Sequence, residues 1–204
     1  MINAEIRAQI INLINKEVVP AVGCTEPMAV ALCAAKAAEV LGCRPQKVRA
    51  QLSANILKNA MGVGIPGTGM IGLPIAIALG TLIGKSEYQL EVIKDLTPET
   101  LEEGKAFIKE QRITILRKSN IEEKLYIEVE SSTETSKATV IISCAHTNIV
   151  YVEKDGNVLL DNRTTRSETC EQKDVLLDLQ MVYDFATTAP VSEIDFILKA
   201  KDYN

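Results

Sequence analysis

The stretch that decides the fold is NILKNAMGVGIPGTGMIGLPIAIALGTLIGK, residues 55–85. It holds seven of the chain's eleven glycines, and residues 59–84 carry no charge. By length alone this is a candidate membrane span. Its two prolines and seven glycines, however, would leave backbone N–H and C=O groups unpaired in lipid. We therefore expect a buried loop followed by a buried helix over residues 70–82, and no membrane partner.

Helical sequence lies on the N-terminal side of this stretch. Residues 3–19 repeat apolar side chains at the spacing of an amphipathic helix, which Pro20 ends. Residues 26–41 are rich in alanine and predict a second, mostly buried helix, with Gly42 suited to its C-terminal end. Residues 47–53 alternate apolar and polar side chains, which indicates a short strand.

On the C-terminal side the sequence predicts an inserted β-α-β-β-β module over residues 86–161. Its helix covers residues 97–110, with Thr97 as N-cap. Asp155-Gly156 predicts a hairpin turn. The expected strands cover residues 87–93, 112–118, 124–132, 137–155 and 157–161. We expect an α+β fold, in which residues 1–85 and 162–204 form a mostly helical, substrate-binding domain around the module.

Composition narrows the classes of partner. The 204 residues carry a net charge of −5, with a pI of about 5.1, which argues against nucleic acid and anionic membranes as partners. The first residues, MINAEIRAQ, lack the apolar core of a secretory signal. Five cysteines without a CxxC motif do not suggest a disulfide framework. These features predict a cytoplasmic protein with reduced thiols.

The glycine-rich stretch allows two interpretations. It matches G-x-G-x-x-G, but no strand directly precedes the first glycine and Pro66 interrupts the pattern, so a nucleotide site is disfavoured. The glycines either let the backbone pack tightly or form a small anion site for a group such as a carboxylate. In the second case Pro66, Gly67, Thr68 and Gly69 form the anion site, through the backbone N–H groups of this segment and the Thr68 hydroxyl.

Cys24 lies just before the predicted second helix. The positive N-terminal end of a helix lowers the pKa of a thiol, so we expect a reactive or metal-binding thiolate. The alternative is a buried cysteine that packs as a small apolar residue. Thr25 and Glu26 either cap the helix or contact a ligand.

Other polar residues extend this candidate site. Lys58 and Asn59 precede the loop and either bind substrate or are solvated at a helix end. The single histidine, His146, is more typical of a structural residue. Thr147 and Asn148 add polar groups to an apolar strand, where a ligand is one of the partners that could satisfy them.

Four motifs together resemble the L-cysteine desulfidase family, which is related to the iron–sulfur L-serine dehydratases. They are AVGCTEPMAVAL (residues 21–32), residues 55–80, HTNIVYVEKDG (residues 146–156) and YDFATTAP (residues 183–190). The resemblance implies elimination of the β-substituent of L-cysteine or L-serine, which gives pyruvate, ammonia and sulfide or water. It also implies a four-iron four-sulfur cluster in the full-length protein.

The same resemblance assigns roles to residues. Thr25, Glu26 and the loop at residues 66–69 would hold the substrate carboxylate, and Cys24 would act as the base or as a cluster ligand. Family members are roughly twice as long, and most cluster cysteines lie in the half absent here. No cysteine follows Cys170. We therefore expect a fragment that carries no cluster and is inactive alone.

Two non-catalytic alternatives stay open at this point. The chain could be a binding module for small amino-acid carboxylates that has kept the anion pocket. It could instead be an interaction domain whose α+β module forms a homodimer.

Overall fold

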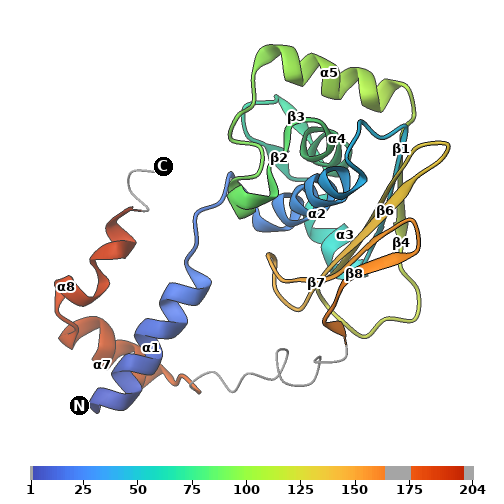
Figure 1. Cartoon of the computed structure of the whole chain (residues 1–204). Helices are drawn as coiled ribbons and strands as arrows, with labels where there is room; N and C mark the ends of the chain where they lie inside the picture. The colour runs from blue at the N-terminus through green and yellow to red at the C-terminus, as the bar shows by residue number, and fades with distance from the viewer. Residues whose placement is uncertain (1, 164–175, 200–204) are drawn as a thin grey trace. The chain divides into compact units, whose positions relative to one another are not determined.

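The computed structural model describes residues 2–163 and 176–199 and has an α+β fold (Figure 1). The chain separates into two compact units. We call residues 1–20 and 170–204 the small unit, and residues 21–169 the large unit.

The large unit combines helices with one extended sheet. Its helical elements are α2 (Thr25–Leu41), α3 (Ala54–Ala60), α4 (Leu73–Ile83), the 3-10 helix η1 (Ser86–Glu91) and α5 (Pro98–Lys109). Its strands are β1 (Lys47–Leu52), β2 (Gly64–Ile65), β3 (Met70–Ile71), β4 (Ile113–Arg117), β5 (Tyr126–Ser132), β6 (Lys137–Ser143), β7 (Ile149–Lys154) and β8 (Asn157–Asp161).

Six strands form a mixed sheet in the order β4-β1-β5-β6-β7-β8. β1 pairs in parallel with β4 and antiparallel with β5, and the other neighbours are antiparallel. Because β1 lies between two strands of the segment expected as an inserted module, residues 86–161 are not separate from residues 21–85. The expected domain boundary at residue 86 is therefore wrong, because strand pairing across it builds one sheet.

The core is built around α2, which packs on β5 and β6 and also against α4. Small side chains let the two helices approach closely. A Cβ added to Gly80 on α4 would come within 2.3 Å of the Ala31 carbonyl oxygen on α2. The alanine-rich and glycine-rich sequences are thus explained by close packing of buried helices. Among the described residues, no helix is long and apolar enough to cross a membrane.

Local sequence signals account for several element ends. Gly42 ends α2 with a left-handed backbone, and Thr97 caps α5 through its side chain. Asp155 and Gly156 both have positive φ, as the predicted hairpin turn requires. Two expectations are wrong. Residues 86–91 form η1, where a strand was expected, and the long strand expected over residues 137–155 is the hairpin of β6 and β7.

The small unit contains α1 (Ala4–Glu17), α7 (Leu179–Thr188), α8 (Val191–Ile194) and the 3-10 helix η3 (Asp195–Lys199). The Arg7 guanidinium on α1 donates hydrogen bonds to the carbonyl and hydroxyl oxygens of Thr188, and it pairs with Glu193 at 3.3 Å. The mostly helical segment expected over residues 162–204 lies partly outside the described residues.

Candidate active site around Glu26

The start of α2 places a thiol against a carboxylate. Gly23 has a φ of +79°, and Cys24 follows it as the N-cap residue with an extended backbone. The Cys24 side chain makes no capping hydrogen bond to the helix. Its Sγ instead donates to Oε2 of Glu26, at 3.0 Å. The thiol is therefore held by the carboxylate in the first turn and does not point at the free N–H groups of the helix.

Glu26 collects donors from two helices. Besides the thiol, the hydroxyl of Thr25 donates to Oε2 at 3.2 Å. The amide Nδ2 of Asn59, on α3, donates to Oε1 at 3.1 Å. We call Cys24, Thr25, Glu26 and Asn59 the Glu26 cluster. All four side chains are partly buried.

The electrostatics of the cluster reverse the expected role of Cys24. The hydrogen bond from Cys24, followed by those from the backbone of α2 and from Asn59, holds the pKa of Glu26 below its usual range despite partial burial. Burial and the hydrogen bond to Glu26 raise the pKa of the Cys24 thiol. The expectation of a thiolate is therefore not supported, because burial and the hydrogen bond to Glu26 both favour the neutral thiol. At neutral pH the ionised group is Glu26.

The glycine-rich loop is a β-hairpin formed by β2 and β3. Its tip has the hydrogen bond and residue pattern of a type II turn: the N–H of Thr68 donates to the carbonyl of Ile65, with Pro66 second and Gly67 third. Gly67 has a φ of +75°, which the third position of this turn requires. The glycine pattern is thus explained by turn geometry and not by a nucleotide site.

Close packing joins the hairpin to the segment before α2. A Cβ added to Gly23 would come within 2.8 Å of Cγ of Pro66, so only glycine fits there without a shift. Pro66 and Gly67 also line a groove of about 480 Å³, whose wall includes Val22 and Leu96. The two segments that the sequence singled out are therefore neighbours in the fold.

Within the hairpin, the Thr68 hydroxyl has hydrogen-bond partners, whereas two backbone N–H groups have none among the described residues. The Thr68 hydroxyl donates to the Ile65 carbonyl at 2.7 Å and accepts from the N–H of Met70 at 2.9 Å, and the residue is buried. It is already used inside the hairpin, so the expected contact of this hydroxyl with an anion is not supported. The N–H groups of Gly67 and Gly69, both exposed residues, have no hydrogen-bond partner in the described part of the chain.

The remaining residues that the sequence predicted for the site either lie in another part of the fold or make no contact with the described residues that gives them a role. Lys58 is exposed on α3, and it makes no hydrogen bond or ion pair with the described residues. His146, Thr147 and Asn148 lie in the turn between β6 and β7, not in a strand. Asn148 donates to the Ser143 carbonyl, which stabilises that turn. No hydrogen bond or ion pair of residues 2–163 and 176–199 links these three residues to Glu26 or to the hairpin.

The cysteines do not assemble a metal site in the described structure. No group of three or more His, Cys, Asp and Glu side chains there is arranged to hold a metal ion. The residues described therefore do not fit a four-iron cluster, and Cys24 has no second thiol as a co-ligand. Cys33 is fully buried, which raises the pKa of its thiol. Cys144 is disulfide-bonded, so the expectation of reduced thiols is wrong for that residue.

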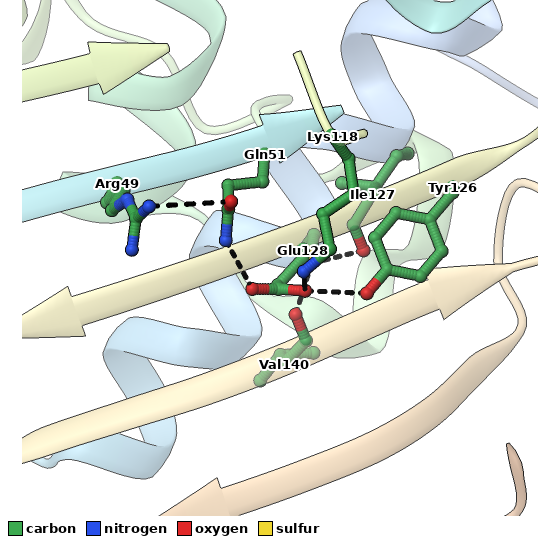
Figure 2. Close-up of polar contacts among 8 residues, drawn as sticks. Arg49, Gln51, Lys118, Tyr126, Ile127, Glu128 and Val140 are labelled. Carbon is green, nitrogen blue, oxygen red and sulfur yellow. Dashed lines mark hydrogen bonds and ion pairs between the residues drawn. The ribbon is translucent and has the colours of Figure 1, made fainter. Parts of the chain in front are cut away.

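A second carboxylate cluster, which the sequence did not indicate, lies on the sheet (Figure 2). Glu128 on β5 accepts hydrogen bonds from Gln51, Lys118 and Tyr126, each at 2.6 Å. Alternation along β5 places Ile127 in the core and Glu128 on the opposite face of the sheet. The only sequence signal was the pair of acidic residues, Glu128 and Glu130, that alternate with apolar residues in the strand sequence YIEVE, residues 126–130.

Comparison with known proteins finds relatives whose sequences match nearly the whole chain. The chain is similar to UPF0597 proteins. A relative from Phocaeicola vulgatus is 63% identical over 198 residues, which cover 97% of this chain and 46% of the relative. One from Bacteroides thetaiotaomicron is 60% identical over 204 residues, 100% of this chain and 47% of the relative. A relative from Aeromonas hydrophila is 41% identical over 197 residues, 95% of this chain and 45% of the relative.

The chain thus spans about half the length of the curated relatives it matches. No family model and no solved structure matches it. The relatives' name states no activity, and nothing in the comparisons indicates a cysteine desulfidase or a serine dehydratase. The family assignment that we drew from the four motifs is therefore wrong: the proteins that share these segments with the chain are UPF0597 proteins.

Proposed function

We propose that the Glu26 cluster and the hairpin at residues 64–71 bind a small α-amino acid. The observation that carries the proposal is the state of Glu26, an ionised and partly buried carboxylate whose donors are all neutral. No basic side chain among the described residues forms an ion pair with it. Because partly buried charges are usually paired, the missing cation is the ammonium group of a ligand.

The carboxylate has room for that ammonium group. A carboxylate offers about four acceptor positions on its two oxygens. Cys24 and Thr25 donate to Oε2, and Asn59 is the one side chain among the described residues that donates to Oε1. One acceptor position on Oε1 is therefore left, and a charged donor there gives a stronger hydrogen bond than a neutral one.

The hairpin supplies the complementary group. Gly67 and Gly69 present exposed N–H groups without protein partners, and backbone N–H groups in turns of this kind bind anions. Gly23 lies against Pro66, which places the tip of the hairpin beside the residue that precedes Cys24. A ligand with an ammonium group at Glu26 and a carboxylate at the hairpin matches both ends.

An elimination reaction on that amino acid is a second candidate, for the longer protein. The observation that favours it is the 3.0 Å hydrogen bond between Cys24 Sγ and Glu26 Oε2. The ionised carboxylate would accept the proton from Cα, and the neutral thiol would donate a proton to the leaving group. No step of this proposal runs through a metal cluster.

Isothermal titration calorimetry with three probes tests the proposed binding. L-Serine carries both groups, ethanolamine lacks the carboxylate and glycolate lacks the ammonium group. We expect L-serine to bind, and each single-group probe to bind at least about tenfold more weakly, because each loses one charge-assisted contact. Equal affinities for the three probes, or no heat with L-serine, would overturn the proposal.

A further inference from the structure

α7 has a wide apolar face, and only part of it is covered. At 3.6 residues per turn, Met181 and Phe185 share one side of the helix, and Phe185 is buried in the small unit. The side next to Phe185 carries a sector of uncharged residues with apolar side chains, about 100° wide. It consists of Leu179, Val182, Tyr183 and Ala186, which we call the α7 stripe.

The α7 stripe is unusually open to solvent. Leu179 is 85% exposed, Tyr183 64% and Val182 47%. Leu176, which lies just before the helix, is 92% exposed. Single exposed apolar residues are ordinary, but a contiguous set on one helix face marks an interaction surface. Among the residues that the structure describes, the small unit thus presents a helix face that no other element covers.

The relatives are longer than this chain. Each reported relative matches 95% or more of the chain and yet has more than half of its own length outside the match. We propose that the α7 stripe binds the polypeptide that corresponds to that other part of the UPF0597 relatives, through an apolar surface on it. The stripe contains no charged residue, so the matching surface buries leucine-type side chains and not ion pairs.

Co-expression tests this assignment. The 204-residue chain, with an affinity tag, is produced together with the part of the Phocaeicola vulgatus relative that lies outside the matched region. We expect a 1:1 complex by size-exclusion chromatography with light scattering. Leu179→Lys and Val182→Lys should each weaken the complex by about tenfold to a hundredfold, the effect of losing one buried aliphatic side chain. Gln180→Lys is the matched control, since it adds the same charge on the same helix outside the stripe.

Hydroxyl-radical footprinting gives a second readout on unaltered protein. Tyr183 and Leu179 should be modified readily in the chain alone and several-fold less in the complex. Failure to recover the second polypeptide, or equal recovery with the stripe variants and the control, overturns the proposal. Protection of Tyr183 in the chain alone also overturns it: a concentration-dependent dimer would then identify a second copy as the occupant, and a protected monomer would identify the large unit.

Discussion

Glu26 and Glu128 are both partly buried carboxylates whose pKa lies below the usual range, but they reach that state differently. Burial raises the pKa of Glu128, and the hydrogen bonds from Lys118, Tyr126 and Gln51 more than compensate. The ammonium group of Lys118 lies 2.6 Å from the carboxylate and neutralises it (Figure 2). Among the described residues, the side chains that donate hydrogen bonds to Glu26 are a thiol, a hydroxyl and an amide, and none of them is charged.

We propose that the difference separates a structural carboxylate, Glu128, from one that binds a ligand, Glu26. Glu128 is paired with the ammonium group of Lys118 and accepts two further hydrogen bonds on the sheet. Its negative charge is therefore neutralised within the fold. Glu26 has its donors but no cation, and it lies at the start of a helix beside a hairpin with free N–H groups. The same side chain therefore stabilises the fold at one position and is available to a ligand at the other.

The largest expected effect comes from removing the cation of the sheet cluster. Lys118→Met leaves Glu128 as a partly buried charge without a counter-ion, so we expect the free energy of unfolding to fall by about 2 kcal/mol. Urea denaturation followed by circular dichroism measures it. Lys137→Met is the matched control: its ion pair with Glu130 on the same sheet spans 3.9 Å and is exposed, so the loss should stay below about 0.5 kcal/mol.

The pH dependence sharpens this test. Since the folded-state pKa of Glu128 is lowered, its contribution to stability is complete above the unfolded pKa, about 4.3, and is lost as the pH falls through the folded pKa. The stability difference between wild type and Lys118→Met should therefore be full at pH 7 and shrink below pH 4.3. A difference that is constant over this range would show that Glu128 is not the partner that matters.

Supplying Glu26 with a cation should make it resemble Glu128. Asn59→Lys replaces the amide beside Oε1 with an ammonium group that competes with the ligand. We expect affinity for L-serine to fall about tenfold or more, with stability little changed. Calorimetry measures the affinity. Asn55→Lys makes the same substitution at an exposed position one turn earlier on α3 and should leave binding unaltered.

A smaller effect is expected at the thiol. Glu26→Gln removes the negative charge and the carboxylate acceptor that keep the Cys24 thiol protonated. Alkylation of Cys24 by iodoacetamide at pH 8 should therefore become several-fold faster, as its pKa falls toward the ordinary value of about 8.5. Mass spectrometry resolves the sites, and the exposed Cys43 serves as the internal control. An unchanged rate would mean that burial alone controls the thiol.

Sequence reasoning was reliable where a signal is local. The glycine that ends α2, the Thr97 cap of α5 and the turn at Asp155-Gly156 depend on residues within one or two turns of chain, and the structure confirms them. The position of β1 between β4 and β5 depends on pairing with residues more than 60 positions away, which no local pattern encodes.

The candidate site shows the same limit. The sequence singled out Cys24, Glu26 and the glycine-rich loop. It predicted a thiolate at Cys24, whereas the contacts of the thiol in the structure favour the neutral form. The helix end was visible in the pattern, whereas the side-chain geometry that points the thiol at Glu26 was not. The Asn59 contact and the Lys118 ion pair depend on how separate elements pack, so neither could be derived from spacing alone.

We propose that Glu26, unlike Glu128, binds the ammonium group of a ligand. Parallel calorimetric titrations of wild type, Glu26→Gln and Glu128→Gln with L-serine at pH 7 test it most directly. The account predicts that Glu128→Gln binds like wild type, while Glu26→Gln binds at least about tenfold more weakly, because a neutral amide cannot replace the charge-assisted contact. Wild-type affinity in Glu26→Gln would contradict it, as would a folded Glu128→Gln that has lost binding.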